Sequence, residues 1–208
     1  MTITYEYEGA LYVNLTNRCN CNCEFCLRHG KAEGSIYTEN SLWLPHEPTH
    51  EEAMASFLSR DVCSYREIVF CGYGEPTVRL HDIREIALGI KKRYPSIKIR
   101  VNTNGHSDLI LGTDSAPLYK DAFDVVSISL NTPDAAKYVE MCHPVYRETA
   151  FDALLTFAKN VNNYVQKTLL SVVRQTLTAE ELEKCYKIAD ELGVTLKVRD
   201  YISKDDNT

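Results

Sequence analysis

The chain has 208 residues, the length of one domain, and 44% of them are hydrophobic and 25% charged, as in ordinary globular proteins. The net charge of −6 argues against binding bulk nucleic acid, because that function needs a basic surface. No apolar run approaches the roughly 20 residues of a membrane span. Residues 1–9 contain Glu6 and Glu8 but no basic residue of a secretory signal. We therefore expect a cytoplasmic protein that does not enter a membrane.

Strand and helix patterns alternate along the chain. Apolar residues in alternation or in short runs predict six strands, at 10–16, 67–71, 97–104, 125–131, 164–174 and 194–202. Apolar residues at helical spacing, or capping signals, predict helices at 49–60, 82–94, 116–123, 149–161 and 178–192. Capping boxes are predicted for Thr49 with Glu52 and for Thr178 with Glu181, and Gly193 is the predicted C-terminal cap of the last helix.

Six strands joined by five helical connections indicate a parallel sheet with right-handed crossovers. Six units are too few for a closed eight-stranded barrel, so the fold class we predict is α/β, an open (βα)6 partial TIM barrel in a single domain over 1–208. Within it we expect a cysteine loop at 17–28, an irregular segment at 28–48 and a polar C-terminal tail at 204–208. The irregular segment, which holds Trp43, is either a lid over the site or a loop that Trp43 anchors to the barrel.

Four cysteines lie within eight residues directly after the first predicted strand: Cys19, Cys21, Cys23 and Cys26. Thiolates this close can converge on one metal centre. Iron–sulfur cubes normally take four thiolates, and a cube held by three leaves one iron open, as a catalytic metal site requires. Cys19, Cys23 and Cys26, with gaps of three and two residues, are the candidate ligands of such a [4Fe–4S] cluster, which would be oxygen-sensitive if exposed. The spacing alone leaves open whether Cys21 is a fourth ligand or a bystander.

Two alternative sites would use Cys21: a zinc knot and a four-cysteine electron-transfer cluster. Zinc sites usually pair two separated Cys-x2-Cys units, and no second unit follows in this chain. An electron carrier would not need a six-stranded barrel. Among the later cysteines, Cys63 and Cys185 are expected to be small buried hydrophobes, and Cys71 a packing residue at a strand end.

Polar residues collect at the ends of the predicted strands, where parallel α/β folds bind their ligands. Polar residues also alternate with apolar ones within the strands, and alternate side chains point to opposite faces of a sheet. The polar set predicts an interior cavity for a polar ligand, with Lys197 and Arg199 available to a carboxylate or a phosphate. The alternative is that these two cations protect an exposed edge strand from pairing.

Two motifs in the first half of the chain resemble those of the radical S-adenosylmethionine (SAM) enzymes. Cys-x3-Cys-x2-Cys with Phe25 before the last cysteine resembles their cluster motif, and residues 72–76 are similar to their Gly-Gly-Glu-Pro motif, with Tyr73 at the second glycine. The resemblance covers nearly the whole chain and implies a [4Fe–4S] cluster and SAM as cofactors. It implies that the open iron binds SAM, and that the reduced cluster cleaves SAM to a 5′-deoxyadenosyl radical that abstracts hydrogen from a substrate.

The same resemblance implies which residues contact SAM. The Gly-Gly-Glu-Pro segment holds the methionine amino group in that superfamily, and the third and fourth strand ends contact the SAM carboxylate and ribose. Phe25 and the end of the fifth strand match adenine-contacting positions. The predicted cofactor-binding residues are Phe25, Gly74, Glu75, Pro76, Asn102, Asn104, Ser129, Asn131, Val172 and Arg174.

Within the superfamily, residues 127–134 followed by Tyr138 and by Cys142-His143-Pro144 resemble a small single-domain branch associated with TatD-family nucleases. The resemblance thus implies a functional association with such a nuclease. Cys142 and His143 are expected in a turn, with a substrate contact as the alternative. The implied partners are SAM, an unidentified small-molecule or protein substrate, and an electron donor such as flavodoxin or ferredoxin.

Two other functions remain open at this point. The first is an activase that installs a glycyl radical on a partner protein, which the short chain and open barrel would suit. The second is a non-catalytic iron–sulfur or zinc protein, for which Cys21 would be required for metal binding.

Overall fold

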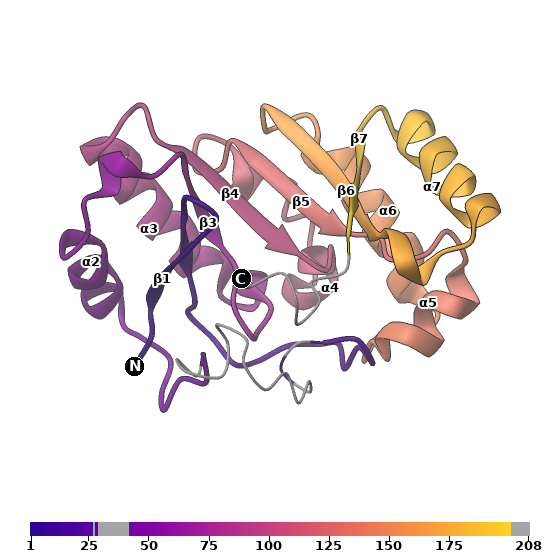
Figure 1. Ribbon diagram of the computed structural model, residues 1–208, viewed down its shortest axis with the longest axis horizontal. Coiled ribbons are helices and arrows are strands. Elements are labelled where there is room, and N and C mark those ends of the chain that lie inside the picture. Colours follow the sequence, from indigo (N-terminus) through magenta and orange to yellow (C-terminus); the bar gives the residue numbers. More distant parts are fainter. Residues whose placement is uncertain (27, 29–41, 201–208) are drawn as a thin grey trace.

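The structure, a computed structural model, describes residues 1–26, 28 and 42–200. Residue 27 of the expected cysteine loop, most of the irregular segment and the tail at 204–208 lie outside these residues, and so does any lid formed by 29–41. The described chain is a single α/β domain built on one seven-stranded sheet with the strand order β1-β2-β3-β4-β5-β6-β7 (Figure 1).

Six of the seven strands are the predicted ones, with shorter bounds. They are β2 (Ala10–Val13), β3 (Glu67–Phe70), β4 (Lys98–Thr103), β5 (Val125–Ser129), β6 (Lys167–Val173) and β7 (Thr195–Arg199). From β3 onward, each is parallel to the strand before it in the sequence. Because chain neighbours are also sheet neighbours, all the C-terminal strand ends meet at one edge, as the predicted open partial barrel requires.

The remaining strand, β1 (Thr4–Tyr7), was not predicted and is antiparallel to β2. Tyr7 pairs with Ala10, so that Glu8 and Gly9 form a two-residue hairpin turn with φ angles of 46° and 71°. Glycine takes positive φ without strain, and such turns join tightly paired strands. The expectation of an entirely parallel sheet is therefore wrong at this edge.

The helices lie in the connections between the parallel strands. They are α2 (His50–Leu58), α3 (Leu80–Arg93), α4 (Ser107–Leu111), α5 (Ala135–Cys142), α6 (Thr149–Val161) and α7 (Ala179–Leu192). Short 3-10 turns occupy η2 (Val62–Ser64), η3 (Pro76–Arg79), η4 (Ala116–Tyr119) and η5 (Arg174–Thr176). The helix predicted at 116–123 is the shorter η4, and α4 and α5 were not predicted.

The capping signals form as predicted. Both capping boxes are present, at the starts of α2 and α7, and Gly193 ends α7 with a φ of 68°. The unpredicted α5 also begins at a capping residue, because the Asp134 carboxylate accepts a hydrogen bond from the Lys137 N–H at 2.7 Å. An N-cap of this kind satisfies a backbone donor that the first turn of a helix leaves unpaired.

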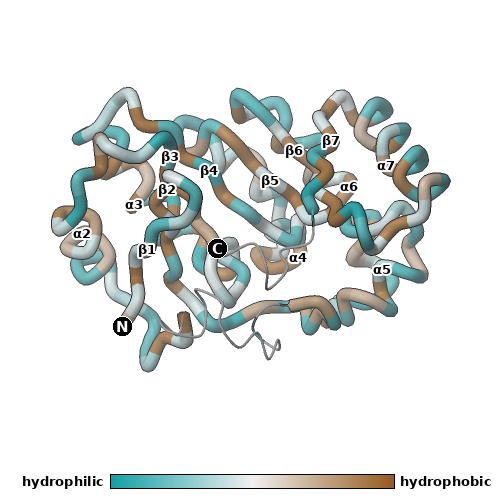
Figure 2. Tube along the Cα trace, viewed as in Figure 1, coloured by the Kyte–Doolittle hydropathy of each residue, from teal (hydrophilic) through white to brown (hydrophobic). Residues whose placement is uncertain are grey.

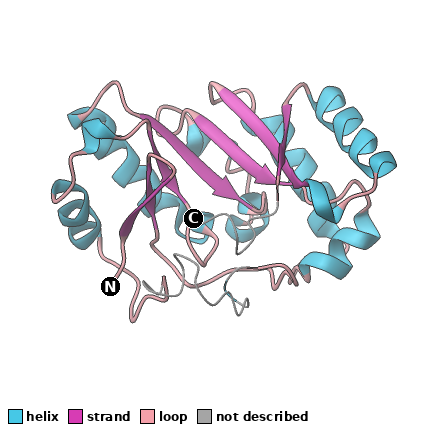
Figure 3. Ribbon diagram, viewed as in Figure 1, coloured by secondary structure: helices cyan, strands magenta, loops and turns pink. Residues whose placement is uncertain are grey.

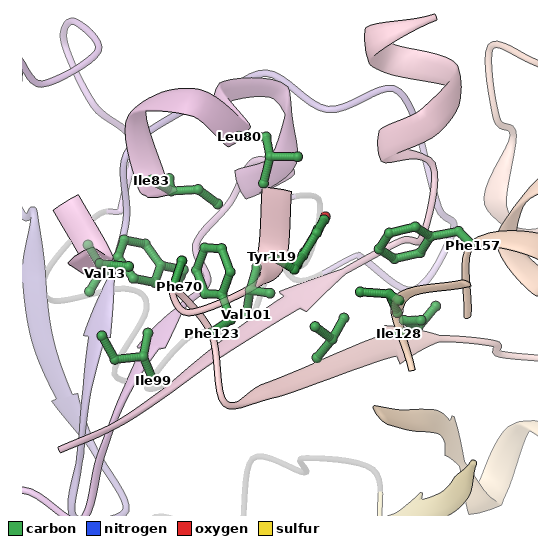
Figure 4. Packing of buried hydrophobic residues seen from close by; sticks show 14 of the residues in the cluster. Val13, Phe70, Leu80, Ile83, Ile99, Val101, Tyr119, Phe123, Ile128 and Phe157 are labelled. Atoms are coloured by element: carbon green, nitrogen blue, oxygen red, sulfur yellow. The ribbon is translucent and has the colours of Figure 1, made fainter. Parts of the chain in front are cut away.

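One face of the sheet packs against the helices and forms the hydrophobic core. Figure 4 shows Val13, Phe70 and Val101 of the strands near Ile83 of α3, while Phe157 of α6 covers the β5 side. In the view of Figure 3 the strands lie in front of α3 and α6. Hydrophobic and hydrophilic residues alternate along the central strands in Figure 2. The face opposite the helices, called the concave face below, consequently carries the polar residues.

A buried carboxylate joins the N-terminal ends of three strands. Asp124, just before β5, accepts a hydrogen bond from the Ile99 N–H of β4 at 2.8 Å. Its other oxygen accepts from Lys91 Nζ at 2.7 Å and from Gln166 Nε2, just before β6, at 3.1 Å. A carboxylate with this many donors holds the strands at one level at the edge opposite the cysteine loop.

We expect Asp124→Ala to lower the free energy of unfolding by about 2–4 kcal/mol, because it leaves the partly buried Lys91 charge and the Ile99 N–H unpaired. Asp124→Asn should cost less, since an amide oxygen still accepts from Ile99. Urea unfolding checks this, with Asp61→Ala as an exposed control that should change stability by less than about 0.5 kcal/mol. A small, equal effect of Asp124→Ala and Asp61→Ala would contradict the assignment.

Candidate active site

The cysteine loop runs along the C-terminal edge of the sheet from β2 to α5 (Figure 1). Its far end is held by backbone hydrogen bonds to the end of α5, from the Asn22 N–H to the Cys142 carbonyl and from the Glu24 N–H to the Met141 carbonyl, each 3.0 Å. The Val145 N–H donates back to the Asn20 carbonyl at 2.9 Å. A loop without regular structure of its own is thus positioned by a helix.

The near end of the loop is held by the segment after β3. The Glu75 N–H donates to the Arg18 carbonyl at 2.8 Å. A Cβ on Gly74 would lie only 2.3 Å from the Thr16 carbonyl oxygen and 2.6 Å from that of Arg18. Only glycine permits this approach, which explains why Gly74 is needed where β3 meets the cysteine loop.

The described end of the irregular segment packs along the start of the loop. The Asn17 side chain donates to the Leu44 carbonyl at 2.7 Å and accepts from the Leu44 N–H at 3.1 Å. Leu42 and Leu44 are buried, while Trp43 is 49% exposed, with its ring 5.4 Å from that of Tyr73. The anchors of this part of the segment are therefore the two leucines rather than Trp43.

The four clustered cysteines do not have equivalent surroundings. Cys19, Cys23 and Cys26 are half-buried, whereas Cys21 is buried. Asn104 Nδ2 donates to the Cys21 sulfur at 3.5 Å, and His106 Nδ1 lies 3.8 Å from the same sulfur. The Cys21 side chain is thus buried against residues that follow β4, and it also contacts the thiols of Cys19 and Cys23.

The thiols also differ in protonation. A hydrogen bond from the Cys21 thiol holds the pKa of Cys19 below its usual value, and one from the Cys142 thiol does the same for Cys23. The donating role raises the pKa of Cys21 and of Cys142. Burial raises the pKa of Cys26. The buried pair, Cys21 and Cys142, accordingly stays as neutral thiols.

The later cysteines depart in part from expectation. Cys142 is the last residue of α5 and is buried rather than in a turn, and it accepts a hydrogen bond from Asn131 Nδ2 at 3.3 Å. His143 is the turn residue, with the left-handed φ of 41° that ends the helix. Cys185 is buried as predicted, but Cys63 lies exposed in η2, so the prediction of a buried Cys63 is wrong.

A buried network behind the loop was missed from the sequence. His106 has no exposed surface, and its Nδ1 accepts a hydrogen bond from Asn20 Nδ2 at 2.8 Å. The proton on Nε2 then faces the Tyr138 hydroxyl at 3.2 Å. Asn104 completes the network by donating to the Asn20 side-chain oxygen at 2.7 Å. Burial lowers the pKa of His106 to about 4, which keeps the ring neutral.

Glu75 is buried and both its carboxylate oxygens accept hydrogen bonds. One oxygen accepts from the Thr77 N–H at 3.0 Å and from the Thr77 hydroxyl at 2.6 Å, and the other accepts from the Asn104 N–H at 2.7 Å. Burial raises its pKa. The side chain therefore joins the end of β3 to the end of β4, directly beneath the cysteine loop.

The remaining predicted SAM contacts are distributed along the same edge. Asn102 lies on the concave face and accepts from Arg100 Nη1 at 2.8 Å, and Ser129 is the half-buried last residue of β5. Arg174 starts η5 at the end of β6 with an exposed side chain 3.6 Å from Asp200. Further members are Phe25, partly buried against the core, Pro76, buried at the start of η3, and Asn131, buried with a φ of 63°.

Val172 is the exception to this arrangement. Its side chain has no exposed surface and belongs to the hydrophobic core on the helix side of β6. Residues at alternate positions of a strand face opposite ways, so Ser171 and Val173 are the ones that face the concave side. Any contact of Val172 with a cofactor would have to use its backbone.

The donor set suits an iron–sulfur cluster. Among the described residues, no three His, Cys, Asp or Glu side chains stand close enough to ligate one metal ion. The thiolates of a four-iron cube each bind a different iron, so they can stand farther apart than the ligands of a single metal ion. Three half-buried thiols in one loop are the soft donors that such clusters take from proteins.

The described residues form a mostly parallel α/β sheet of the open partial-barrel class, with a cysteine loop at its C-terminal edge. A family model described as the radical SAM superfamily matches residues 13–189. The chain belongs to this superfamily and is an enzyme, and the superfamily uses a [4Fe–4S] cluster and SAM. The resemblance found in the motifs is thereby confirmed, and the non-catalytic alternative is set aside. The TatD-associated branch stays a prediction.

Several curated proteins are similar in sequence. GTP 3′,8-cyclase of Corynebacterium glutamicum is 36% identical over 139 residues, which are 63% of this chain and 33% of that protein. A probable GTP 3′,8-cyclase of Pyrococcus abyssi is 28% identical over 192 residues, covering 90% of this chain and 55% of the relative. The chain thus spans about a third to just over half of the length of these curated relatives.

Solved structures share the fold. SuiB of Streptococcus suis, in complex with its precursor peptide SuiA, matches with a TM-score of 0.68 at 16% identity, over 95% of this chain and 40% of that one. A radical SAM methyltransferase of Sphaerobacter thermophilus matches with a TM-score of 0.58 at 15% identity, over 98% and 70% of the two chains. At these identities the likeness concerns the fold alone. Within the described residues, no helix has the length and apolarity to cross a membrane.

The neutral His106 predicts a pH dependence of stability. Because the pKa of the folded state lies near 4, well below the roughly 6.5 of an unfolded histidine, the unfolded chain alone takes up a proton as the pH falls below about 6.5. This contribution is fully present above pH ~6.5 and is lost towards pH ~4, about 3 kcal/mol in all.

Urea unfolding of the reduced, metal-free protein between pH 7 and pH 5 measures this loss. His106→Gln should have a flatter pH dependence than wild type, whereas His81→Gln, at an exposed position, should keep the wild-type slope. Identical slopes in all three proteins would show that folding does not lower the pKa of His106.

Proposed function

We propose that Cys19, Cys23 and Cys26 hold the [4Fe–4S] cluster of this radical SAM enzyme, and that the substrate binds on the concave face. One observation carries the proposal: the loop with the three half-buried thiols is joined to the strand ends that bear the predicted SAM contacts, while the fourth thiol, Cys21, is enclosed by Asn104 and His106. When bound, the cluster supplies an electron that cleaves SAM, giving the 5′-deoxyadenosyl radical that abstracts hydrogen from substrate.

The chain's own residues prepare the site for this chemistry. Glu75 connects the ends of β3 and β4, and Gly74 lets that junction come within contact of the loop. Asn104 connects the junction to the loop through Asn20. Each of these groups is hydrogen-bonded to, or packed against, at least one other, so the SAM-binding edge is ordered before SAM binds. Preorganisation of this kind reduces the conformational entropy that is lost on binding.

The comparisons and the fold say less about the identity of the substrate than about the cofactors. The curated relatives are named for action on GTP, and the SuiB structure contains a peptide, but this chain covers only part of each. We propose a hydrogen-atom abstraction from a substrate with polar or charged groups, since the concave face carries polar side chains. An external one-electron donor of the flavodoxin or ferredoxin kind is part of this proposal. The glycyl-radical activase and the association with a TatD-family nuclease remain predictions.

The cysteine assignment predicts a sharp difference between variants. Cys19→Ala, Cys23→Ala and Cys26→Ala should each lose most of the roughly four irons and four sulfides per chain that reconstitution introduces. Cys21→Ala should retain them, because its sulfur is not a ligand. Anaerobic reconstitution followed by iron and sulfide analysis measures both, with Cys185→Ala as a control at a buried thiol in α7. A loss of iron in Cys21→Ala equal to that in Cys23→Ala would contradict the assignment.

Glu75→Gln should raise the dissociation constant of SAM at least about tenfold. The amide replaces an acceptor by a donor that faces either the Asn104 or the Thr77 N–H, which costs about 1–3 kcal/mol and displaces the β3–β4 junction. Equilibrium dialysis of SAM with the reconstituted protein gives the constant. Glu51→Gln, on the exposed first turn of α2, is the matched control. An unchanged constant in Glu75→Gln would remove this residue from the SAM site.

A further inference from the structure

A row of polar side chains crosses the concave face in register. Ser129 of β5 pairs with Ser171 of β6, and Ser171 pairs with Lys197 of β7. Residues paired across neighbouring strands carry their side chains next to one another on one face. Asn104 stands at the same level, since it follows Thr103, the partner of the residue before Ser129. The row thus leads from the residues that hold the cysteine loop to the edge strand β7.

Positive charge collects at the β7 end of this row. Arg199 lies two residues after Lys197 and so shares its face. Arg100 of β4 lies on the same face, where Glu67 binds its guanidinium at 3.0 and 3.1 Å. Lys197 and Arg199 form no ion pair with any described residue. Three cations therefore share two carboxylates, Glu67 and Glu8, in a chain whose net charge is −6.

These cations stand close enough to repel one another. The pKa of Lys197 is lowered, first by partial burial and then by the positive charges of Arg100 and Arg199. Lys197 and Arg199 are both exposed, and the carboxylates of Glu67 and Glu8 offset part of this repulsion. A bound anion would relieve it.

We propose that Lys197 and Arg199 form an anion subsite that binds a phosphate or carboxylate group of the substrate. This inference rests on the proposed function and narrows the substrate to a small organic anion. Three strand spacings, about 14 Å, separate the backbones of Asn104 and Lys197. A ligand held by its anionic group at β7 extends across the concave face past the half-buried Ser129, with its other end towards the cysteine loop, where hydrogen abstraction takes place.

The alternative that the sequence left open, in which Lys197 and Arg199 protect an edge strand from pairing, explains fewer of the observations than an anion subsite does. β7 is the edge strand of the sheet, and exposed charges there do discourage pairing with another chain. That role requires only that charges be present. It does not require Lys197 to be in register with Ser171, or to approach the buried Arg100.

Thermal unfolding of the reconstituted protein tests the subsite, with sodium phosphate and sodium succinate as probes in separate titrations and sodium chloride at equal ionic strength as the baseline. We expect at least one probe to raise Tm saturably, and the one that does identifies phosphate or carboxylate as the group bound. In Lys197→Gln/Arg199→Gln the concentration for half-maximal shift should rise at least about tenfold. Lys92→Gln/Lys120→Gln, which removes two exposed positive charges elsewhere, should behave as wild type.

The dissociation constant of SAM is measured on the same proteins. If the double variant loses the anion response but binds SAM as wild type does, the subsite belongs to the substrate. If it loses SAM binding as well, the cations hold the SAM carboxylate and the inference is wrong. No saturable shift in wild type, or an equal shift in both double variants, also overturns it. Failure of wild type to bind SAM would instead contradict the proposed function, so the two failures are distinguishable.

Discussion

The architecture of the site depends on one junction, where Glu75 meets both the cysteine loop and the end of β4. Its N–H bonds the Arg18 carbonyl, and its buried carboxylate accepts from the Asn104 N–H. Without this junction the loop would lose its link to the ends of β3 and β4 and keep only its contacts with α5 and with residues 44 and 47. Through Asn104 and Asn20 the same junction reaches His106, so that the strand ends, the loop and the helix form one hydrogen-bonded unit. A buried unit of this kind is cooperative, since removing one member leaves others unsatisfied.

Much of the fold could be predicted from the sequence, because helix caps and apolar periodicity are local signals. The capping boxes at Thr49 and Thr178 and the six parallel strands form as expected. β1 was not predicted because it is only four residues long, although Thr4–Tyr7 alternates and Glu8-Gly9 is a usable hairpin turn. α5 was not predicted because its signals are few, the cap at Asp134 and the buried positions Tyr138 and Cys142 within eight residues.

Only part of the site could be predicted from the sequence. Cysteine spacing and the Gly74–Pro76 motif stand out because the chemistry requires particular residue types close together in the chain. The surroundings of Cys21 could not be predicted, since Asn104 and His106 are more than 80 residues away from it and meet it only through the sheet. The signal for His106 is its place directly after the Thr-Asn-Gly segment at the end of β4. The signal for Cys142 is its place at the end of α5, the helix that holds the cysteine loop. The core position of Val172 follows from the strand alternation, which the family comparison did not take into account.

The central claim is that Cys21 does not bind the cluster while the other three thiols do, and electron paramagnetic resonance tests it most directly. The spectrum of the anaerobically reduced, reconstituted protein is recorded with and without SAM, for wild type and for Cys21→Ala. The account predicts a [4Fe–4S]+ signal that shifts on addition of SAM and does so in both proteins. A signal that ignores SAM, or one that disappears in Cys21→Ala, would mean a closed four-cysteine cluster and would contradict the account.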